Sequence, residues 1–259
     1  MKALLSSTYF GPIQWYQKLN RYDECLIERH ESFIKQTYRN RMIIPTTNGP
    51  LSLTIPTNHD ISLSMKDIRI SDHANWRHVH WNALLSAYGE SPFFEYYQDD
   101  IRPFYEKKYE FLFDFNMETT EKMIELLDIR PKISITEEYI LSEERRVKSK
   151  ESEERRTKSE ETTFGGQGES QFDSIADHKV QSSNLKVQSN EVQSNEVQSK
   201  EVQSIVDFRD AIRPKKPLPD AEFVPKRYYQ VYGQKHGFQP NMSILDLLFN
   251  EGNEAIFYL

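Results

Sequence analysis

Residues 2–31 read KALLSSTYFGPIQWYQKLNRYDECLIERHE, and the alternation of apolar runs with turn and helix signals in this stretch decides the fold class. The apolar run over residues 2–8 is typical of a short buried strand. Gly11-Pro12 then interrupts the run, and a proline suits the first turn of a helix. Apolar residues at every third position predict a helix from residue 13 to about Tyr22, and residues 24–28 predict a second strand. A strand–helix–strand unit of this kind favours two parallel strands joined by a right-handed crossover.

Polar side chains follow both predicted strands at the point where each strand ends. The first strand runs into Ser6-Ser7-Thr8-Tyr9-Phe10, and the second runs into Glu28-Arg29-His30-Glu31. In open parallel sheets, ligands bind outside the carboxyl ends of the strands. We therefore expect a ligand site where these two segments meet.

Further strands are predicted before residue 140. Residues 39–45 and 51–57 are apolar runs joined by a loop that contains Asn48-Gly49, which is a strong hairpin signal. Residues 66–70 alternate in the same way, and residues 132–136 are compatible with a strand. We expect the additional strands over 39–70 to join the first two in one mixed sheet.

The helical part of the chain is predicted from caps and periodicity. Ser71 or Asp72 can cap a helix that ends at Gly89, and Ser91-Pro92 can start another. The very aromatic stretch 104–115 leads into an amphipathic helix over 116–127. The sequence therefore predicts a mixed α/β fold, with an N-terminal βαβ unit and a helical half.

Residues 142–204 differ in composition from both flanks. They contain two of the 32 aromatic residues, and in their second half a valine followed by Gln-Ser recurs every five residues. One valine in five cannot bury the face of a helix or strand, so this segment is predicted to be a disordered, low-complexity repeat insert. The chain ends in a capped apolar helix over 241–252 and an apolar tail that should pack on the first part. Residues 1–141 and 205–259 are therefore predicted to form one domain.

Charge and composition limit the classes of function. A net charge of −7 argues against a nucleic-acid partner, because phosphate neutralisation needs clustered Lys and Arg. The single cysteine, Cys25, lies in an apolar run and is interpreted as a buried, inert thiol. The chain has no Gly-rich phosphate loop and no dinucleotide fingerprint, so no cofactor is expected. The apolar run at the N-terminus is too short for a signal peptide or membrane span, which predicts a cytoplasmic protein without a membrane span.

The first group of candidate functional residues lies between residues 30 and 41. If residues 39–45 form a strand, Arg39 and Arg41 share one face and, with Lys35, form a fork suited to phosphate or carboxylate. His30 stands between two acids at a strand end and can serve as an acid or base. The alternative is that both arginines form surface ion pairs and His30 is a solvated loop residue.

The second group lies in the predicted helix 71–88. His80 is the strongly polar member of an otherwise apolar helix face, which is more typical of a core histidine than of a site residue. His78 and His80 do not form a helical metal pair, because positions two apart do not face each other. No metal site is therefore predicted. Near the C-terminus, Ser243 and Asp246 are interpreted as a capping-box variant with a structural role.

Several short motifs occur in a specific order along both flanks. They are Leu4–Tyr16, Tyr22-Asp23-Glu24, Glu28–Glu31, Lys35–Arg41, Asn75-Trp76, Ser91-Pro92-Phe93-Phe94 and Asn241–Asp246. In this order they resemble the WbqC-like protein family over about residues 1–140 and 205–259. The resemblance implies a role in surface-polysaccharide (O-antigen) biosynthesis, with transfer of a small amino-acid group such as glycine onto a sugar as one suggestion.

The resemblance carries over to Tyr9, Pro12, His30, Arg39-Asn40-Arg41, Trp76 and Asp246. With it, the sequence favours a transferase that acts on an anionic, activated sugar or amino-acid compound. We expect His30 to be catalytic and the substrate to be bound by six residues: Tyr9, Lys35, Arg39, Asn40, Arg41 and His80. The alternative hypothesis is a non-catalytic binding or interaction protein whose contact surface is the aromatic stretch 93–115.

Overall fold

The structure, a computed structural model, describes residues 1–58, 63–141 and 204–259. Met1–Ile140 and Gln203–Leu259 form one compact unit, and both flanks contribute side chains to its hydrophobic core. The predicted disordered insert lies outside the described residues, except for its last residue, Ser204. The carbonyl of Ser204 accepts a hydrogen bond of 3.0 Å from the backbone N–H of Lys2.

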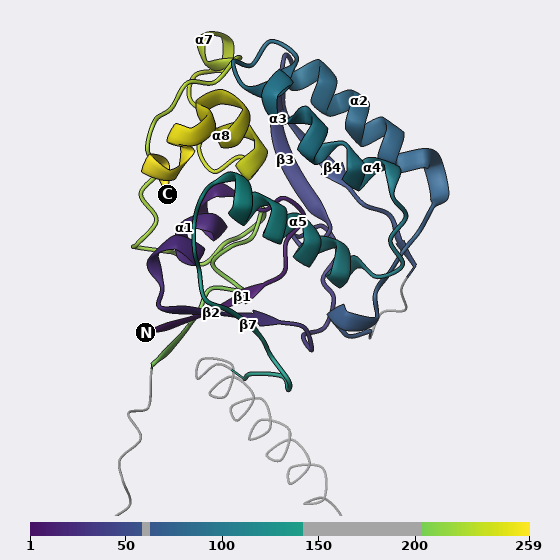
Figure 1. The fold of residues 1–259 in the computed structure, drawn as a ribbon. Helices are drawn as coiled ribbons and strands as arrows, with labels where there is room; N and C mark the ends of the chain where they lie inside the picture. Colours follow the sequence, from purple (N-terminus) through teal and green to yellow (C-terminus); the bar gives the residue numbers. More distant parts are fainter. Residues whose placement is uncertain (59–62, 142–203) are drawn as a thin grey trace, which may run out of the picture. The chain divides into compact units, whose positions relative to one another are not determined.

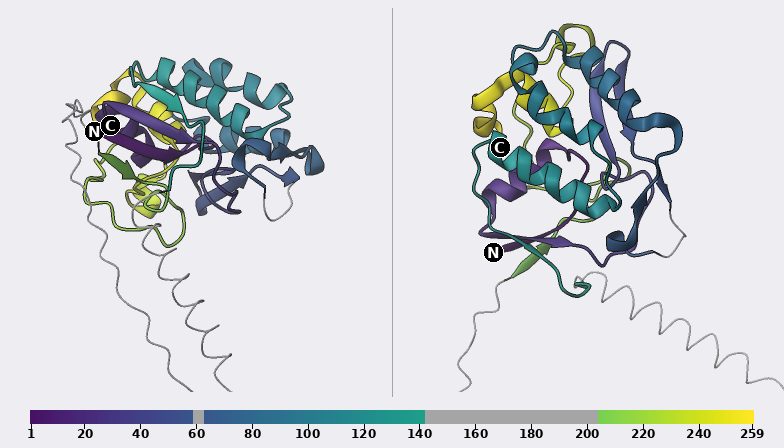
Figure 2. Two further views of the ribbon diagram at one scale, coloured as in Figure 1. Left: turned by 90° about the horizontal axis from the view of Figure 1, so that it is seen from below. Right: turned by 45° about the vertical axis from the view of Figure 1, so that its right-hand side comes forward.

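A four-stranded sheet in the order β7–β2–β1–β8 lies at the centre of this unit. Its strands are β1 (Lys2–Ser6), β2 (Glu24–Glu28), β7 (Ile133–Ile135) and β8 (Ile205–Asp207). Every neighbouring pair in it is parallel. The mixed α/β class and the parallel first pair are therefore confirmed. Figure 2 shows β8, from the C-terminal flank, beside β1, so the sheet is assembled from both flanks.

The other strands of the described chain do not extend this sheet, and the prediction of one mixed sheet is wrong in that respect. β3 (Arg41–Thr46) and β4 (Gly49–Thr54) form a separate antiparallel hairpin, and β5 (Thr57–Asn58) pairs with β6 (Arg69–Ile70). The hairpin turn lies where Asn48-Gly49 predicted it, with Gly49 at φ 99°. Pro45 pairs with Pro50 in the hairpin, and prolines cannot donate ladder hydrogen bonds, which confines such strands to edges.

Helix α1 (Ile13–Arg21) connects β1 to β2 and begins after Pro12, as predicted. Most of its side chains are buried, including that of Lys18, which is 1% exposed. The Lys18 ammonium lies 2.9 Å from the Asp220 carboxylate and 4.2 Å from the centre of the Phe208 ring. Three residues from opposite ends of the chain thus form one buried contact.

The helical half consists of η1 (Met65–Asp67), η2 (His73–Asn75), α2 (Trp76–Tyr88), α3 (Phe94–Ile101), α4 (Pro103–Glu106) and α5 (Leu112–Leu126). Helix α2 begins later than predicted, because Ala74 and Asn75 adopt positive φ angles of 64° and 45° that interrupt a helix. The aromatic stretch is mostly core: its buried members are Phe94, Tyr97, Phe104, Tyr105, Phe113 and Phe115.

The C-terminal flank contains α7 (Gly233–His236), α8 (Ile244–Glu251) and η3 (Gly252–Tyr258). Helix α8 contacts α1 and α3, as Figure 1 shows. The backbone N–H of Ile244 donates to the carbonyl of Gly11 at 2.8 Å, and the Ser243 hydroxyl donates to the carbonyl of Phe10 at 2.8 Å. The prediction that the apolar C-terminal end packs on the first part is confirmed.

Candidate functional site

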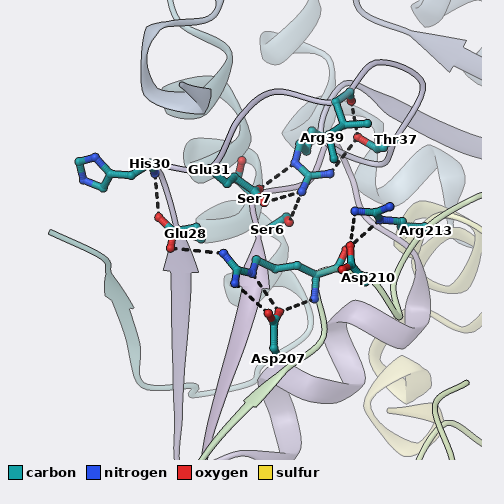
Figure 3. Close-up of polar contacts among 12 residues, drawn as sticks. Ser6, Ser7, Glu28, His30, Glu31, Thr37, Arg39, Asp207, Asp210 and Arg213 are labelled. Carbon is teal, nitrogen blue, oxygen red and sulfur yellow. Dashed lines mark hydrogen bonds and ion pairs between the residues drawn. The ribbon is translucent and has the colours of Figure 1, made fainter. Parts of the chain in front are cut away.

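Charged and hydroxyl side chains gather at the carboxyl ends of β1, β2 and β8 (Figure 3). We call this group the strand-end cluster; it consists of Ser6, Glu28, Glu31, Arg39, Asp207 and Arg209. Because the three strands are parallel, their last residues meet at one edge of the sheet. Loop residues from 31–39 and the residue two positions after β8 complete the group.

Arg39 is the first of two buried guanidinium groups in the cluster. Its side chain is 2% exposed, and its Nε and Nη2 donate to both carboxylate oxygens of Glu31 at 2.7 and 2.5 Å. Nη2 also donates to the Ser6 hydroxyl at 2.8 Å, and Nη1 donates to the Thr37 hydroxyl at 3.2 Å. A guanidinium carries five N–H donors, so this geometry fixes the plane of the group and leaves one N–H of Nη1 without an acceptor among the described residues.

Arg209 is the second buried guanidinium, with a side chain that is 0% exposed. Its Nε and Nη2 donate to the two carboxylate oxygens of Asp207 at 2.9 and 2.8 Å, and Nη1 lies 3.5 Å from the Glu28 carboxylate. Glu28 in turn accepts hydrogen bonds from the Thr136 hydroxyl and the Ile140 backbone N–H, both at 2.8 Å. Opposite charges thus hold both arginines in place.

A pocket lies between the two arginines. Its empty volume is about 230 Å³, and its lining residues are Leu5, Ser6, Thr8, Trp15, Tyr38, Arg39, Phe208, Arg209 and Ile212. Two of its hydroxyl groups have no hydrogen-bond partner among the described residues, namely those of Thr8 and Tyr38. Burial raises the pKa of Tyr38 to about 12, so this hydroxyl stays protonated and can donate. Unpaired buried donors in a charged pocket are the arrangement that a small anion can satisfy.

The loop that carries Thr8 is held in a tight conformation. Phe10 has a φ of 39°, which is uncommon for a residue other than glycine. A Cβ atom at Gly11 would lie 2.4 Å from the Thr8 Oγ1, so only glycine allows the two residues to approach this closely. The hydrogen bonds that Ser243 and Ile244 donate to this loop then fix it from the C-terminal flank.

Comparison with known proteins places this geometry in a family. The sequence model of the WbqC-like protein family matches residues 7–207 and 219–258, which is nearly the whole chain. The chain belongs to the WbqC-like protein family. It is also 24% identical over 260 residues to the uncharacterized protein Rv1507c of Mycobacterium tuberculosis, a match that covers 99% of this chain and 96% of that protein. No solved structure matches the chain.

In this WbqC-like chain, three of the predicted site residues lie apart from the pocket. His30 is half-buried, its backbone N–H donates to Glu28 at 2.8 Å, and its imidazole ring points away from the cluster in Figure 3. Lys35 is exposed on the loop before Tyr38. Arg41 begins β3, one residue after the segment that was predicted to start the strand with Arg39, and its Nε donates to the Thr54 hydroxyl at 3.0 Å. Because Arg39 lies outside the strand, the alternation argument for a fork of Arg39 and Arg41 fails.

The other predicted substrate residues are buried. The Asn40 side chain donates to the carbonyl of Ile55 at 3.0 Å and ties the turn to the chain beyond the hairpin. The Tyr9 hydroxyl lies 3.0 Å from His80 Nδ1 and 2.9 Å from the Tyr105 hydroxyl. Burial lowers the pKa of His80 to about 4, so the ring is neutral at physiological pH. The structure thus brings Tyr9 and His80 together, but it places both within the core.

Asp246 does not complete the predicted capping box. Ser243 caps α8 by accepting from the Leu245 backbone N–H, but the Asp246 carboxylate accepts from Tyr228, Gln230 and Asn250 instead. Burial raises the pKa of Asp246 to about 6, and these hydrogen bonds oppose the rise. We call these four polar residues, Asp246, Tyr228, Gln230 and Asn250, the Asp246 cluster.

Sequence reasoning missed Arg209, Asp207 and Thr8 as members of the site. A signal for the first two exists: Ile205-Val206 is a short apolar pair followed directly by Asp207-Phe208-Arg209-Asp210, which is the pattern of a strand end. It was obscured by the prolines that follow from Pro214 onward. Within the described residues, no group of three or more His, Cys, Asp or Glu side chains is arranged to hold a metal ion. None of the described helices combines the length and the apolar character that crossing a bilayer requires.

Proposed function

We propose that this WbqC-like protein is a transferase of surface-polysaccharide biosynthesis that binds the anionic group of an activated sugar or amino-acid compound in the strand-end pocket. The place of the pathway in this proposal comes from family membership. The reaction class comes from the same resemblance, together with a preformed pocket that can hold a small anion.

The observation that carries the proposal is the pocket between Arg39 and Arg209. Two buried guanidinium groups and two unpaired hydroxyl groups line one small cavity at the carboxyl ends of parallel strands. The Glu31 and Asp207 carboxylates hold the arginines in fixed orientations, so little conformational entropy is lost when an anion binds. Such preorganisation is what a binding site needs and what a surface arginine lacks.

In the proposed reaction, a hydroxyl or amino group of the acceptor attacks the activated carbon of the donor. A new bond forms to that carbon, the bond to the leaving group breaks, and the leaving group departs with the bonding electrons. The acceptor's proton is released to solvent. The pocket orients the anionic group beside the reaction centre. Because its ring points away from the cluster, His30 has no catalytic role at this pocket in the proposal.

The alternative, an interaction protein with an aromatic contact surface, has less support. Most aromatic side chains of the stretch 93–115 are core residues, while Tyr96 and Phe93 are exposed at 74% and 38%. A partner surface of this kind needs a large contiguous apolar patch, and two exposed rings do not supply one.

Isothermal titration with inorganic phosphate, L-alanine, glucose 1-phosphate and UDP-glucose tests the proposal. We expect at least one of these to bind, and we expect Arg39→Lys, which keeps the charge but loses the bidentate fork, to weaken that binding at least tenfold. Arg41→Lys is the matched control and should bind like the wild type, because Arg41 does not line the pocket. Loss of binding in the Arg41 variant alone would move the site to the hairpin, and failure of all four compounds to bind would refute the proposal.

Transfer itself requires a second measurement. The compound that binds is incubated with the protein and candidate acceptors, and the products are analysed by mass spectrometry for the mass of the transferred group. Thr8→Val is the variant of choice here, because it removes a donor from the pocket while both buried ion pairs stay intact.

A further inference from the structure

We infer that the pocket accepts the carboxylate of a small monocarboxylic acid with an apolar body, and that sugars and phosphate esters remain outside it. This inference rests on the proposed function, because it names the group that the anion site holds. Three properties of the pocket lead to it: its size, its apolar wall and its unpaired donors.

The size of the pocket excludes large substrates. Its empty volume of about 230 Å³ is below the roughly 300–1,000 Å³ that sites for drug-sized ligands occupy. A nucleotide-activated sugar is larger than such a ligand. Only a small acid, or the small acyl part of a larger compound, can be enclosed between Arg39 and Arg209.

The wall of the pocket opposite its polar groups is apolar. It is formed by Leu5, Trp15, Phe208 and Ile212. The indole N–H of Trp15 already donates to the Ser6 carbonyl at 2.9 Å, so this ring offers a carbon face only. A sugar ring carries a hydroxyl group on most carbons, and burying those groups against carbon without partners is costly. An aliphatic or aromatic body buries apolar surface there instead.

The donors that remain in the pocket match a carboxylate. They are the hydroxyl groups of Thr8 and Tyr38 and one N–H of Arg39, counted over the described residues. A carboxylate has two oxygens and one negative charge, whereas a phosphate monoester has three terminal oxygens and up to two charges. The Glu31 carboxylate lies directly behind Arg39, so a dianion meets stronger like-charge repulsion than a monoanion does.

Three matched probes test the inference by isothermal titration. Butyrate has the predicted anion and body, glycerate has the same anion with a hydroxyl-rich body, and butylphosphonate has the apolar body with a different anion. We expect butyrate to bind at least tenfold tighter than either of the others. Thr8→Val and Tyr38→Phe should each weaken butyrate binding by about 5- to 30-fold, because each removes one hydrogen bond to a charged group.

Tyr16→Phe is the matched control for these variants. Tyr16 is a buried tyrosine that does not line the pocket, so its variant should bind butyrate like the wild type. If butylphosphonate or glycerate binds tightest and Thr8→Val weakens that binding, the inference is wrong while the anion site stands. If no probe binds, or if binding is unchanged in both pocket variants, the inference and the proposed pocket fail together.

Discussion

The strand-end cluster and the Asp246 cluster are both built from buried polar side chains, but they solve the problem of buried charge in different ways. In the strand-end cluster, two guanidinium groups are paired with carboxylates from the strand ends and loops. In the Asp246 cluster, one fully buried carboxyl group is held by neutral donors, and burial raises its pKa to about 6.

The difference teaches which buried polar groups point to a ligand. The strand-end cluster borders a pocket in which the Thr8 and Tyr38 hydroxyls have no partner in the described chain. The neutral donors of the Asp246 cluster all come from the C-terminal flank and tie α8 to the segment before it. Burial alone therefore marks structure, whereas burial beside a pocket with unpaired donors marks a candidate site.

The largest effect is expected from Arg39→Met, which leaves the buried Glu31 carboxylate without its counter-charge. We expect the free energy of unfolding, measured by urea denaturation, to fall by about 3–5 kcal/mol. Arg41→Met removes one hydrogen bond from a half-exposed side chain and should cost about 0.5–1.5 kcal/mol.

The double variant Arg39→Met, Glu31→Leu sharpens this comparison. Replacing a buried ion pair by apolar side chains is often neutral, so the double variant should recover most of the lost stability. Equal costs for Arg39→Met and Arg41→Met would show that the strand-end ion pair is not the buried contact described above.

A second prediction concerns His80, the buried neutral histidine beside Tyr9. Its pKa falls from 6.5 in the unfolded chain to about 4 in the folded protein, so only the unfolded chain gains a proton between these values. The stability that His80 contributes is therefore complete above pH 6.5 and declines by about 3 kcal/mol as the pH falls to 4. Denaturation of the wild type and His80→Gln at several pH values measures this, and parallel profiles would contradict it.

Asp246 should show the opposite slope over nearly the same range of pH. Its pKa rises from 3.8 to about 6 on folding, so the folded state holds the proton more tightly. Its contribution to stability is complete below pH 3.8 and is lost as the pH rises through 6, by about 3 kcal/mol. Asp246→Asn should therefore gain stability relative to the wild type as the pH is raised from 4 to 7. A variant whose difference from the wild type is constant with pH would remove Asp246 as a titrating group.

The sequence predicted the parallel part of the fold because local signals and tertiary packing agree there. The apolar run before Gly11-Pro12 and the periodicity after it become β1 and α1 as expected. The hairpin was recognised from Asn48-Gly49, but its place in the molecule was not. Whether a strand joins a sheet depends on which edge is free to accept it, and no residue of the hairpin itself encodes that.

The candidate site was predicted in place but not in composition. The carboxyl ends of β1 and β2 do carry it, yet Arg209 comes from 170 positions beyond Arg39 in the numbering and enters through β8, a strand of three residues. Arg39 was identified as an anion-binding residue from an assumed strand, whereas it lies in the turn before β3. Side chains that meet only through long-range pairing leave no local pattern, so Arg209 and Thr8 could not be found by periodicity.

The smallest effect is expected at the loop that positions Thr8. Gly11→Ala places a methyl group 2.4 Å from the Thr8 Oγ1, and the loop is held by hydrogen bonds from Ser243 and Ile244, so we expect a loss of about 1–3 kcal/mol in urea denaturation. Gly233→Ala is the matched control, because its methyl group would meet Gln230 at an ordinary 3.8 Å and should change stability by less than about 0.5 kcal/mol. Adding Thr8→Ala to Gly11→Ala removes the closest clash and should restore part of the loss. Without that restoration, the contact between the two residues would not be what makes glycine necessary, and the loop would owe its shape to the C-terminal flank alone.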